Sequence, residues 1–574
     1  MTATSPVPTI YRNGRILTME TGGDPVYDAL GTRDGRVVAV GAAADVRRAV
    51  GAGADELDLR GASLMPGIVD THPHLIHFGV IEGAAVDIKD AVSHDDIVRR
   101  IAARAATTAA GEWIMTTPVG EPHYFLRRSW RDLAEGKLPD RHVLDRAAPS
   151  HPVWIQAWAP VIPNVIAFNS AGLAKLGITR ETPDQIEHVW IEKDERGEPT
   201  GILRGSVTNY YTGDAFMDRL LLQLPLMQPD KLIPGMAAAQ AMYARMGVTT
   251  GYEGHVMDRA LIEAYRFLRQ SGLLTVRILA APEAEYYSLA SAYPITLEEF
   301  QARLAEAVEL VDRGDDMLKV DGVTISRGGP CWPGFMLMRE PYKGPYGEMT
   351  RGRSFIPKEW CELAMRYAAE HRLRLNVVVA GSGEHDEYLD QLEAVDRDHG
   401  IAGRHWIMQH AFFVDEPQAR RYARLGIDVT TSMSFSWGKG DLFIERMGED
   451  VLQDLIPLRR MKDAGCLVAC GSDWGPKNIF EQIALATTHE FCGSGRRNAG
   501  PAQVVTRAEA VAMWTREAAR ILQWDGIGTL AVGSHADLIV VDRDPLTCPV
   551  ESLPGTQVLR TVLGGCTVHD AHAL

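Results

Sequence analysis

The stretch "MPGIVDTHPHLIHFG", residues 65–79, places three histidines directly after a short apolar run that a proline and a glycine introduce. An apolar run of this length between turn residues is typical of a buried strand in a parallel sheet. His72 and His74 end this strand two positions apart, so their side chains point the same way. His77 lies outside the strand, and we interpret it as a pocket or structural residue. Histidines at a strand end can also be ordinary hydrogen-bonding residues, so the rest of the chain must identify the site.

Seven further apolar, β-branched segments follow the first strand at 67–72, and helical stretches such as 297–314 and 357–372 separate most of them. They lie at residues 247–254, 275–282, 317–323, 374–381, 404–411, 426–433 and 466–474. Strands that alternate with helices predict a parallel sheet with crossover helices. Eight such strands predict an α/β fold of the TIM-type (β/α)8 barrel, whose chemistry takes place at the C-terminal strand ends.

The rest of the sequence divides into two further units. Both ends of the chain contain short β-rich pieces, with Asn-Gly and Asp-Gly turn signals near the start, which predicts a β-sandwich built from residues 1–64 and 525–574. The barrel then takes residues 65–75 and 236–524. Residues 76–235 are too many for a structureless loop and contain strand-like pieces of their own. We expect them to form an inserted α+β lobe that can close over the barrel mouth.

Composition excludes several classes of partner. The chain has 59 basic and 75 acidic residues, a net charge of −16, which disfavours nucleic acid and anionic membranes as partners. Seven cysteines without a CxxC pair indicate reduced thiols. We see no signal peptide and no apolar run of about 18 residues that could span a membrane. We therefore expect a cytoplasmic protein that acts on a small molecule.

Polar side chains gather at the ends of four predicted strands. Lys319 ends the fourth strand, His410 the sixth and Asp473 the eighth, on the same rim as His72 and His74. Taken alone, each has an ordinary explanation as a surface lysine, a buried histidine or a helix N-cap. Together they form the ligand set that a divalent, zinc-like ion prefers. Asp473 is the natural acceptor of a proton from metal-activated water, whose pKa the ion lowers to about 7.

The chain resembles the amidohydrolase superfamily, specifically the amidohydrolase-3 or YtcJ-like group that includes N-substituted formamide deformylases. The matching pieces run in family order over nearly the whole chain and include "MPGIVDTHPHL", "NSAGLAKLGIT", "GEPTGILRG", "EPYKGPYG", "RHWIMQHA", "CGSDWGP" and "GTLAVGSHADLIVVDRDP". The resemblance implies a metal-dependent (β/α)8 hydrolase with a terminal β-sandwich and an insert after the first barrel strand. It also implies a homodimer, which is common among such proteins.

The family's metal ligands match this sequence at five positions. The His-x-His pair matches His72 and His74, and the strand-six histidine matches His410. The strand-eight aspartate matches Asp473. The strand-four lysine, which is often carboxylated to bridge two metals, matches Lys319. By this resemblance Asp473 and His410 are the catalytic residues.

The sequence departs from the family pattern at three places. Val378 stands where the strand-five histidine is expected, and Gln409 replaces the glutamate before the strand-six histidine. In the insert, Pro163 and Asn164 replace a Gly-His pair. Together these departures indicate a divergent member of the family.

The valine has a direct consequence for the number of metal ions. Valine cannot bind metal, so a second ion would keep only His410 and the Lys319 carbamate as protein ligands, fewer than the three that a catalytic zinc normally holds. We therefore expect one divalent ion per chain, with zinc as the leading candidate. Glu384 or His385, just past strand five, are the alternative ligands if two ions bind.

The leading hypothesis is hydrolysis of a C–N bond in an amide-like small molecule by metal-activated water. Aromatic residues after the catalytic strands suggest an apolar or aromatic substrate. The candidate pocket residues are Trp332, Tyr342, Trp474 and, from the insert, Trp158 and Asn164.

Two other functions fit the same sequence. A metal-dependent lyase, of the decarboxylase or retro-aldol type, needs an electrophilic metal and a base but no bridging hydroxide, which suits a site without the strand-five histidine. A non-catalytic binding protein would keep the fold and lose turnover. Product analysis separates the first alternative from hydrolysis, and a turnover assay separates the second.

Overall fold

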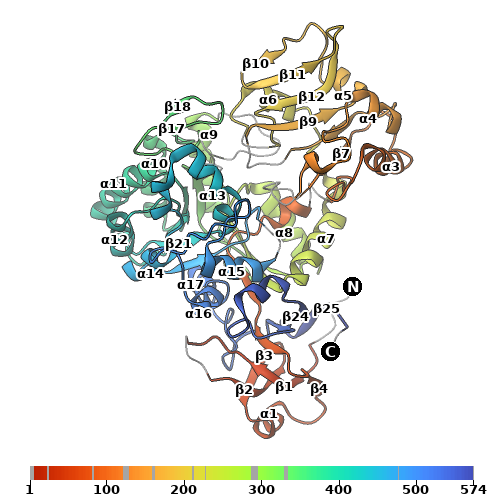
Figure 1. The fold of residues 1–574 in the computed structure, drawn as a ribbon. Coiled ribbons are helices and arrows are strands. Elements are labelled where there is room, and N and C mark those ends of the chain that lie inside the picture. The colour runs from red at the N-terminus through yellow and green to blue at the C-terminus, as the bar shows by residue number, and fades with distance from the viewer. Residues whose placement is uncertain are drawn as a thin grey trace.

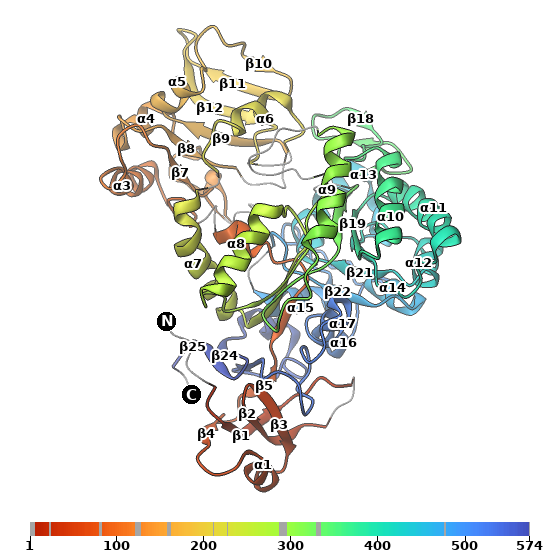
Figure 2. The same cartoon turned by 180° about the vertical axis from the view of Figure 1, so that it is seen from behind.

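The structure is a computed structural model that describes residues 6–21, 25–79, 83–120, 128–157, 162–209, 212–226, 228–285, 295–328, 334–475 and 478–572. It has three parts (Figure 1). Parallel strands and their helices lie in the middle, a mixed lobe lies at one end, and a sheet made from both chain termini lies at the other end. The view from behind shows the same order of the three parts (Figure 2).

All eight predicted parallel strands are present in the central part. They are β6 (Ile68–Asp70), β13 (Val248–Glu253), β14 (Arg277–Ala280), β15 (Leu318–Val320), β19 (Leu375–Val379), β20 (Ile407–His410), β21 (Asp428–Thr431) and β22 (Val468–Cys470). The fourth strand resumes after a short break as β16 (Val323–Ser326). Hydrogen bonds arrange these strands as two parallel sheets, with the orders β6-β13-β14-β15 and β16-β19-β20-β21-β22.

The two sheets also meet at their outer edges. An isolated parallel bridge between Glu283 and Thr324 connects the segment after β14 with β16. On the other side, the Asp473 N–H donates to the carbonyl of His72 over 2.8 Å, which joins the segments after β22 and β6. The C-terminal ends of the first and eighth strands are therefore neighbours, and the histidine pair and the aspartate of the predicted site lie there.

Helices follow most of the parallel strands and cover the outside of the two sheets (Figures 1 and 2). They include α7 (Leu232–Arg245), α8 (Arg259–Gln270), α9 (Leu297–Leu310), α10 (Lys358–His371), α11 (Ser382–His399), α12 (Glu416–Arg424), α13 (Ser434–Met447), α14 (Leu458–Ala464), α15 (Ile479–Thr488), α16 (Arg507–Ala512) and α17 (Arg516–Leu522). Several begin with a side-chain cap, as at α9, where Thr296 and Glu299 form a capping box. Apolar residues of α17 pack beneath the strands with Trp524, in one cluster with Val69 and Ile407.

The inserted lobe contains a six-stranded sheet of order β10-β11-β12-β9-β8-β7 and has its own apolar core. Its elements are α3 (His94–Ala105), β7 (Ile114–Thr116), α4 (Arg141–Ala147), β8 (Val153–Ile155), β9 (Asn164–Phe168), α5 (Ser170–Lys175), β10 (Gln185–Ile186), β11 (Val189–Lys193), β12 (Pro199–Gly205) and α6 (Ala215–Leu221). Ser206 bonds the hydroxyl of Tyr346 over 2.6 Å, and His188 stacks on the same ring. The lobe therefore packs on the segment after the fourth strand, which carries the hairpin β17 (Tyr342–Lys343) and β18 (Met349–Thr350).

Both chain termini contribute to one eight-stranded sheet of order β25-β24-β23-β5-β1-β2-β3, with β4 paired to β1. Its elements are β1 (Thr9–Ile16), β2 (Tyr27–Arg33), β3 (Arg36–Gly41), α1 (Ala43–Val50), β4 (Asp55–Asp58), β5 (Ser63–Pro66), β23 (Leu538–Val541), β24 (Val558–Leu563) and β25 (Cys566–Asp570). Where the sequence predicts a sandwich, hydrogen bonds connect all eight strands into one sheet. A bridge from Arg36 to His535 brings its β3 edge back beside the segment before β23, so the sheet bends around a shared apolar core.

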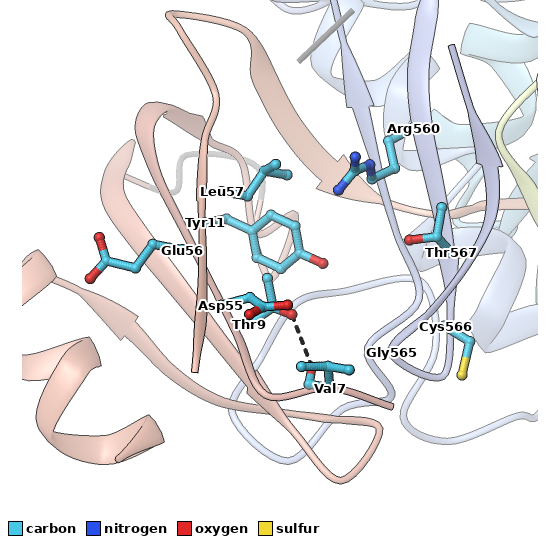
Figure 3. Close-up of a pocket in the computed structure, with 10 residues that line it drawn as sticks. All are labelled: Val7, Thr9, Tyr11, Asp55, Glu56, Leu57, Arg560, Gly565, Cys566 and Thr567. Atoms are coloured by element: carbon cyan, nitrogen blue, oxygen red, sulfur yellow. Dashed lines mark hydrogen bonds between the residues drawn. The ribbon is translucent and has the colours of Figure 1, made fainter. Parts of the chain in front are cut away.

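A pocket of about 430 Å³ lies in this terminal sheet, between the β1 and β4 strands and the β24–β25 hairpin (Figure 3). Its lining residues are Val7, Thr9, Tyr11, Asp55, Glu56, Leu57, Arg560, Gly565, Cys566 and Thr567. None of them belongs to the predicted metal site. In the described ranges, no helix is both long and apolar enough to cross a membrane.

A buried ion pair joins the terminal sheet to the parallel strands. Arg277, the first residue of β14, donates from Nε and Nη2 to both carboxylate oxygens of Asp537 over 2.6 and 2.9 Å. The two side chains are 3% and 2% exposed. Asp537 also accepts the backbone N–H of Gly564 over 2.7 Å. This bidentate, fully enclosed pair fixes the two parts to each other.

We expect Asp537→Asn to destabilise this joint strongly, because it leaves the buried Arg277 guanidinium without a countercharge. Removal of one partner of a buried pair costs about 3–5 kcal/mol of unfolding free energy. Scanning fluorimetry should show a clearly lower melting temperature. Glu449→Gln is the matched control, because it removes an exposed partner of Arg496; an equal loss in both variants would contradict this role for Asp537.

Candidate metal centre

The turn after β6 is held by two carboxylates, one at the end of β6 and one at the end of the neighbouring β13. Asp70 Oδ1 accepts the backbone N–H of His72 over 3.0 Å and that of Ser472 over 2.9 Å. Glu253, at the end of β13, accepts the N–H of Leu75 over 2.6 Å. These bonds fix the backbone on both sides of the His-x-His pair and connect it with the second and eighth strands.

His72, His74 and Asp473 form a buried group that could hold a metal ion. One ligand atom from each lies within 4.8 Å of the others. The two Nε2 atoms of the histidines are 2.9 Å apart, and His74 Nε2 lies 3.5 Å from Asp473 Oδ1. The three side chains come from the first and eighth strand ends, as the sequence predicts. Two imidazole nitrogens and one carboxylate are a donor set that suits zinc.

The electrostatics of the group also suit a cation. Burial alone would raise the pKa of Asp473, but His72 and hydrogen bonds from His410 and His74 hold it well below its usual value. Burial and the neighbouring His72 hold the pKa of His74 well below its usual value. An ionised carboxylate and a neutral imidazole in a buried place are stabilised by a bound divalent ion.

His77 orients His74, which refines its interpretation from the sequence. His77 Nε2 lies 3.0 Å from the carbonyl oxygen of Val256, which can only accept, so Nε2 carries the proton. Its Nδ1 then has a lone pair and lies 3.3 Å from His74 Nδ1. His74 therefore donates from Nδ1 and keeps a lone pair on Nε2, the nitrogen that faces His72 and Asp473. Such outer hydrogen bonds fix the tautomer of metal-binding histidines.

Three site residues have a backbone that L-amino acids rarely adopt. The φ angles of His74, His410 and Asp473 are 52°, 79° and 49°. Each such residue costs of order 1–3 kcal/mol, and such residues cluster at functional sites. Their coincidence at three strand ends supports a functional rather than a merely structural role for this rim.

His410 joins the group at the end of β20, as predicted. Its Nε2 lies 3.4 Å from Asp473 Oδ2, and its ring stacks on His72 with 5.5 Å between centroids. Burial lowers its pKa. The ring centroid of Phe435 is 5.0 Å from that of His410. His410 is therefore placed beside the aspartate, within reach of a molecule bound at the three-residue group.

The structure does not place Lys319, the predicted bridging ligand, beside the histidine group. Lys319 lies in the middle of β15, with Nζ 4.3 Å from the ring centroid of Trp524. Trp524 follows α17 at the N-terminal ends of the strands, where Arg374, just before β19, donates to the carbonyl of Ile521. The physical reason is the length of the fourth strand, which continues through β16 to Ser326, seven residues further on. A carboxylated Lys319 would therefore lie away from the histidines.

The fifth strand offers no replacement ligand. Val378 is fully buried and lies opposite Gln409 in the ladder of β19 and β20. His385 uses both ring nitrogens elsewhere, toward the Tyr422 hydroxyl at 2.8 Å and the Phe412 carbonyl at 2.7 Å. The carboxylate of Glu384 accepts three backbone N–H groups, from Leu337, Ala380 and Gly381. Both residues are therefore structural.

Two residues that the sequence analysis does not single out also lie at this rim. The ring of His255, two residues past β13, is 5.4 Å from that of His72 and 5.6 Å from that of His74. Its Nδ1 lies 3.0 Å from Glu283 Oε1, after β14. The signal in the sequence was a histidine in "GYEGHV" and a glutamate in "APEAE", each just past a predicted strand. The family pattern does not indicate either residue, because its metal ligands lie on other strands.

The structure places the five predicted pocket residues at different positions relative to the histidine group. Trp474 stacks on His74 with 4.6 Å between centroids and therefore borders the group. The hydroxyl of Tyr342 accepts from Gly334 and donates to Met336, which organises its own loop. Asn164 begins β9 in the inserted lobe. Trp158 and Trp332 lie outside the described residues, so their role stays a prediction.

We expect His77→Leu to weaken zinc binding although His77 is not a ligand, because His74 loses the acceptor that fixes its tautomer. Loss of such an outer partner typically costs 10–100-fold in metal affinity. His72→Ala, which removes a ligand, should cost more. Chelator competition measures both affinities.

His151→Leu is the matched control, because His151 is a buried histidine of the inserted lobe whose Nε2 lies near the Thr108 carbonyl. Its zinc affinity should equal that of the unmodified protein. Unchanged affinity in His77→Leu would show that His77 does not orient His74.

The comparisons with known proteins agree with this geometry. Residues 55–569 match the amidohydrolase family. An N-substituted formamide deformylase from Arthrobacter pascens is 26% identical over 92% of this chain and 93% of its own length. A putative amidohydrolase, YtcJ, from Bacillus subtilis is 26% identical over 98% of this chain and 99% of its own length.

Among solved structures, an uncharacterized metal-dependent hydrolase from Pyrococcus furiosus has the same fold. The TM-score is 0.70 at 21% identity, over 94% of this chain and 100% of the other. The predicted α/β fold and the resemblance drawn from the sequence motifs are thus confirmed. The chain belongs to the amidohydrolase family, and it is a metal-dependent amidohydrolase.

Proposed function

We propose that this protein hydrolyses a C–N bond in a small amide-like molecule and holds one zinc ion at His72, His74 and Asp473. The observation that carries the proposal is the buried group of two imidazole nitrogens and one carboxylate within 4.8 Å of one another. The similarity to an N-substituted formamide deformylase over nearly the full length of both chains supports an N-substituted amide as the substrate class.

A divalent ion held there would polarise the carbonyl of a substrate and lower the pKa of water. Asp473 has the right position to move a proton, since it lies between His74 at 3.5 Å and His410 at 3.4 Å. Its carboxylate accepts a proton from the attacking water and passes it to the leaving amine nitrogen as the C–N bond breaks. His410 keeps the carboxylate oriented and can donate to the substrate's oxygen.

Aromatic rings around the group support an apolar or aromatic substituent on the substrate. Trp474 covers His74, and Phe78 packs on Trp474 with 5.0 Å between centroids. Phe435 borders His410. These rings beside the histidines would exclude bulk water from the reacting bond and favour apolar groups.

We also propose that the two parallel sheets close into one eight-stranded barrel. The bridge between Glu283 and Thr324 and the hydrogen bond from Asp473 to His72 support closure at both edges. Such closure would place every strand end at the same mouth, below the inserted lobe. A homodimer stays a prediction that light scattering can test.

We expect close to one zinc equivalent per chain after dialysis, because Val378 leaves the fifth strand without a ligand. Removal of the ion with a chelator should abolish turnover, and zinc should restore it. Val378→His should raise the capacity towards two equivalents, whereas Val378→Ile should leave it at one. Elemental analysis checks all three proteins, and two tightly held equivalents in the unmodified protein would contradict the prediction.

We expect Asp473→Asn to lower kcat by about 10²-fold or more on a hydrolysed N-formyl or N-acyl amine, because the proton carrier is lost. Asp428→Asn is the control, since Asp428 is a buried carboxylate at the start of β21 paired with His405; kcat should stay close to normal.

Reaction in ¹⁸O-labelled water should label the released acid and liberate one amine per turnover. Products that contain no ¹⁸O and no released amine would show that the reaction is not hydrolysis and would favour lyase chemistry. Near-normal kcat in Asp473→Asn would remove this residue from the proton transfer.

A further inference from the structure

His255 lies beside the histidine group although it comes from a different strand. Its ring centroid is 5.4 Å from that of His72, 5.6 Å from that of His74 and 6.5 Å from that of His410. It is buried, with 5% of its surface exposed. Four imidazoles from the ends of β6, β13 and β20 therefore lie close together near Asp473.

Glu283 holds His255 in one orientation. The carboxylate Oε1 lies 3.0 Å from His255 Nδ1 and also accepts the Ser326 hydroxyl over 2.5 Å. Oε2 accepts the backbone N–H of Val256 over 2.6 Å. Because Glu283 is buried and its two oxygens accept from Ser326 and Val256, the carboxylate has a fixed position beside Nδ1 of His255. A proton on Nδ1 leaves Nε2 as the nitrogen that offers a lone pair.

A carboxylate that accepts from one nitrogen of an imidazole is the usual partner of a metal-binding histidine. Carboxylate–histidine pairs also exist for structural reasons, as with the buried Asp428 and the partly exposed His405 at the opposite strand ends. The pair of His255 and Glu283 differs because its imidazole is packed edge to face against His72, a residue of the metal group.

Ring spacings indicate which ion His255 would share. A zinc–nitrogen distance of about 2.1 Å puts each ring centre about 3.2 Å from the ion, so two imidazoles on one ion have centres about 5–6 Å apart. His255 meets this spacing with both His72 and His74. Its distance from His410 is longer, so a separate ion between His255 and His410 is less well matched.

We propose that His255 binds the same metal ion as His72, His74 and Asp473 through Nε2, with Glu283 as its positioning residue. The proposal rests on the metal site of the proposed function and adds a ligand from the second strand. His255, two residues past β13, would add a third imidazole to the single ion that we expect with valine at position 378. The ion would then have three imidazole nitrogens and one carboxylate, and His410 would contact the substrate and not the ion.

X-ray absorption fine structure of the zinc-loaded, unmodified protein tests the ligand count directly and needs no variant. Three imidazole ligands are expected, and two would overturn the proposal. In His255→Ala, zinc affinity measured by chelator competition should fall by about 10²-fold or more, and the fitted imidazole count should fall to two. In His410→Ala the fitted imidazole count should stay at three. A count of two in His410→Ala together with three in His255→Ala would show that His410, and not His255, is the third imidazole ligand.

Glu283→Gln tests the positioning role with little change in shape. Its zinc affinity should fall by about 10–100-fold while the imidazole count stays at three. His94→Ala is the matched control, because His94 is a buried histidine of the inserted lobe that contacts the Lys137 carbonyl at 2.8 Å. Circular dichroism and the melting temperature establish that each variant is folded.

The outcomes separate this proposal from the proposed function. Unmodified protein that binds no zinc would overturn the metal site itself. Zinc-binding, active protein whose affinity does not change in folded His255→Ala would overturn only the role of His255. If His255→Ala does not fold, two other measurements test the proposal: the X-ray absorption of the unmodified protein and the zinc affinity of Glu283→Gln. Two imidazole ligands in the unmodified protein and an unchanged zinc affinity in Glu283→Gln would reject it.

Discussion

The carboxylate of Asp70 is the constraint on which the site depends. One of its oxygens accepts the backbone N–H groups of both His72 and Ser472. Ser472 lies 402 positions after Asp70 in the chain. This shared acceptor holds the end of the first strand against the end of the eighth. The bond from the Asp473 N–H to the His72 carbonyl completes the junction. Without it, the histidine pair and the aspartate would have no fixed separation, and a metal site requires distances defined to a few tenths of an ångström.

Buried acidic groups recur around this junction, and each has a different task. Asp473 is held ionised by the histidines around it. Burial would raise the pKa of Glu283, but His255 and hydrogen bonds from Ser326 and Val256 hold it at about 2. Burial raises the pKa of Glu253 to about 7, and its role is to accept the backbone after the histidine pair. Carboxylates without water are costly unless they are paired, so their concentration here marks the place where the protein maintains charge for function.

Much of the fold could be predicted from the sequence, because strand periodicity and turn residues are local signals. All eight parallel strands lie within the predicted segments, and the site at His72, His74, His410 and Asp473 assembles as expected. The position of Lys319 away from this site could not be predicted, because the sequence shows only that a lysine follows apolar residues and not how far the strand continues beyond it. His255 was missed because it stands two residues past a strand, and only the packing of neighbouring strand ends shows which way such a side chain turns.

The sequence by itself determined the order of strands and helices, the amidohydrolase motifs and the chemical types at the strand ends. These depend on hydrophobic pattern and residue identity, which the chain carries residue by residue. Only the tertiary structure decided which of these side chains meet. Lys319 lies beside Trp524, and the packing of β13 against β6 brings His255 to His72 and His74. Strand register and the length of each strand are set by contacts between distant segments, so no local pattern encodes them.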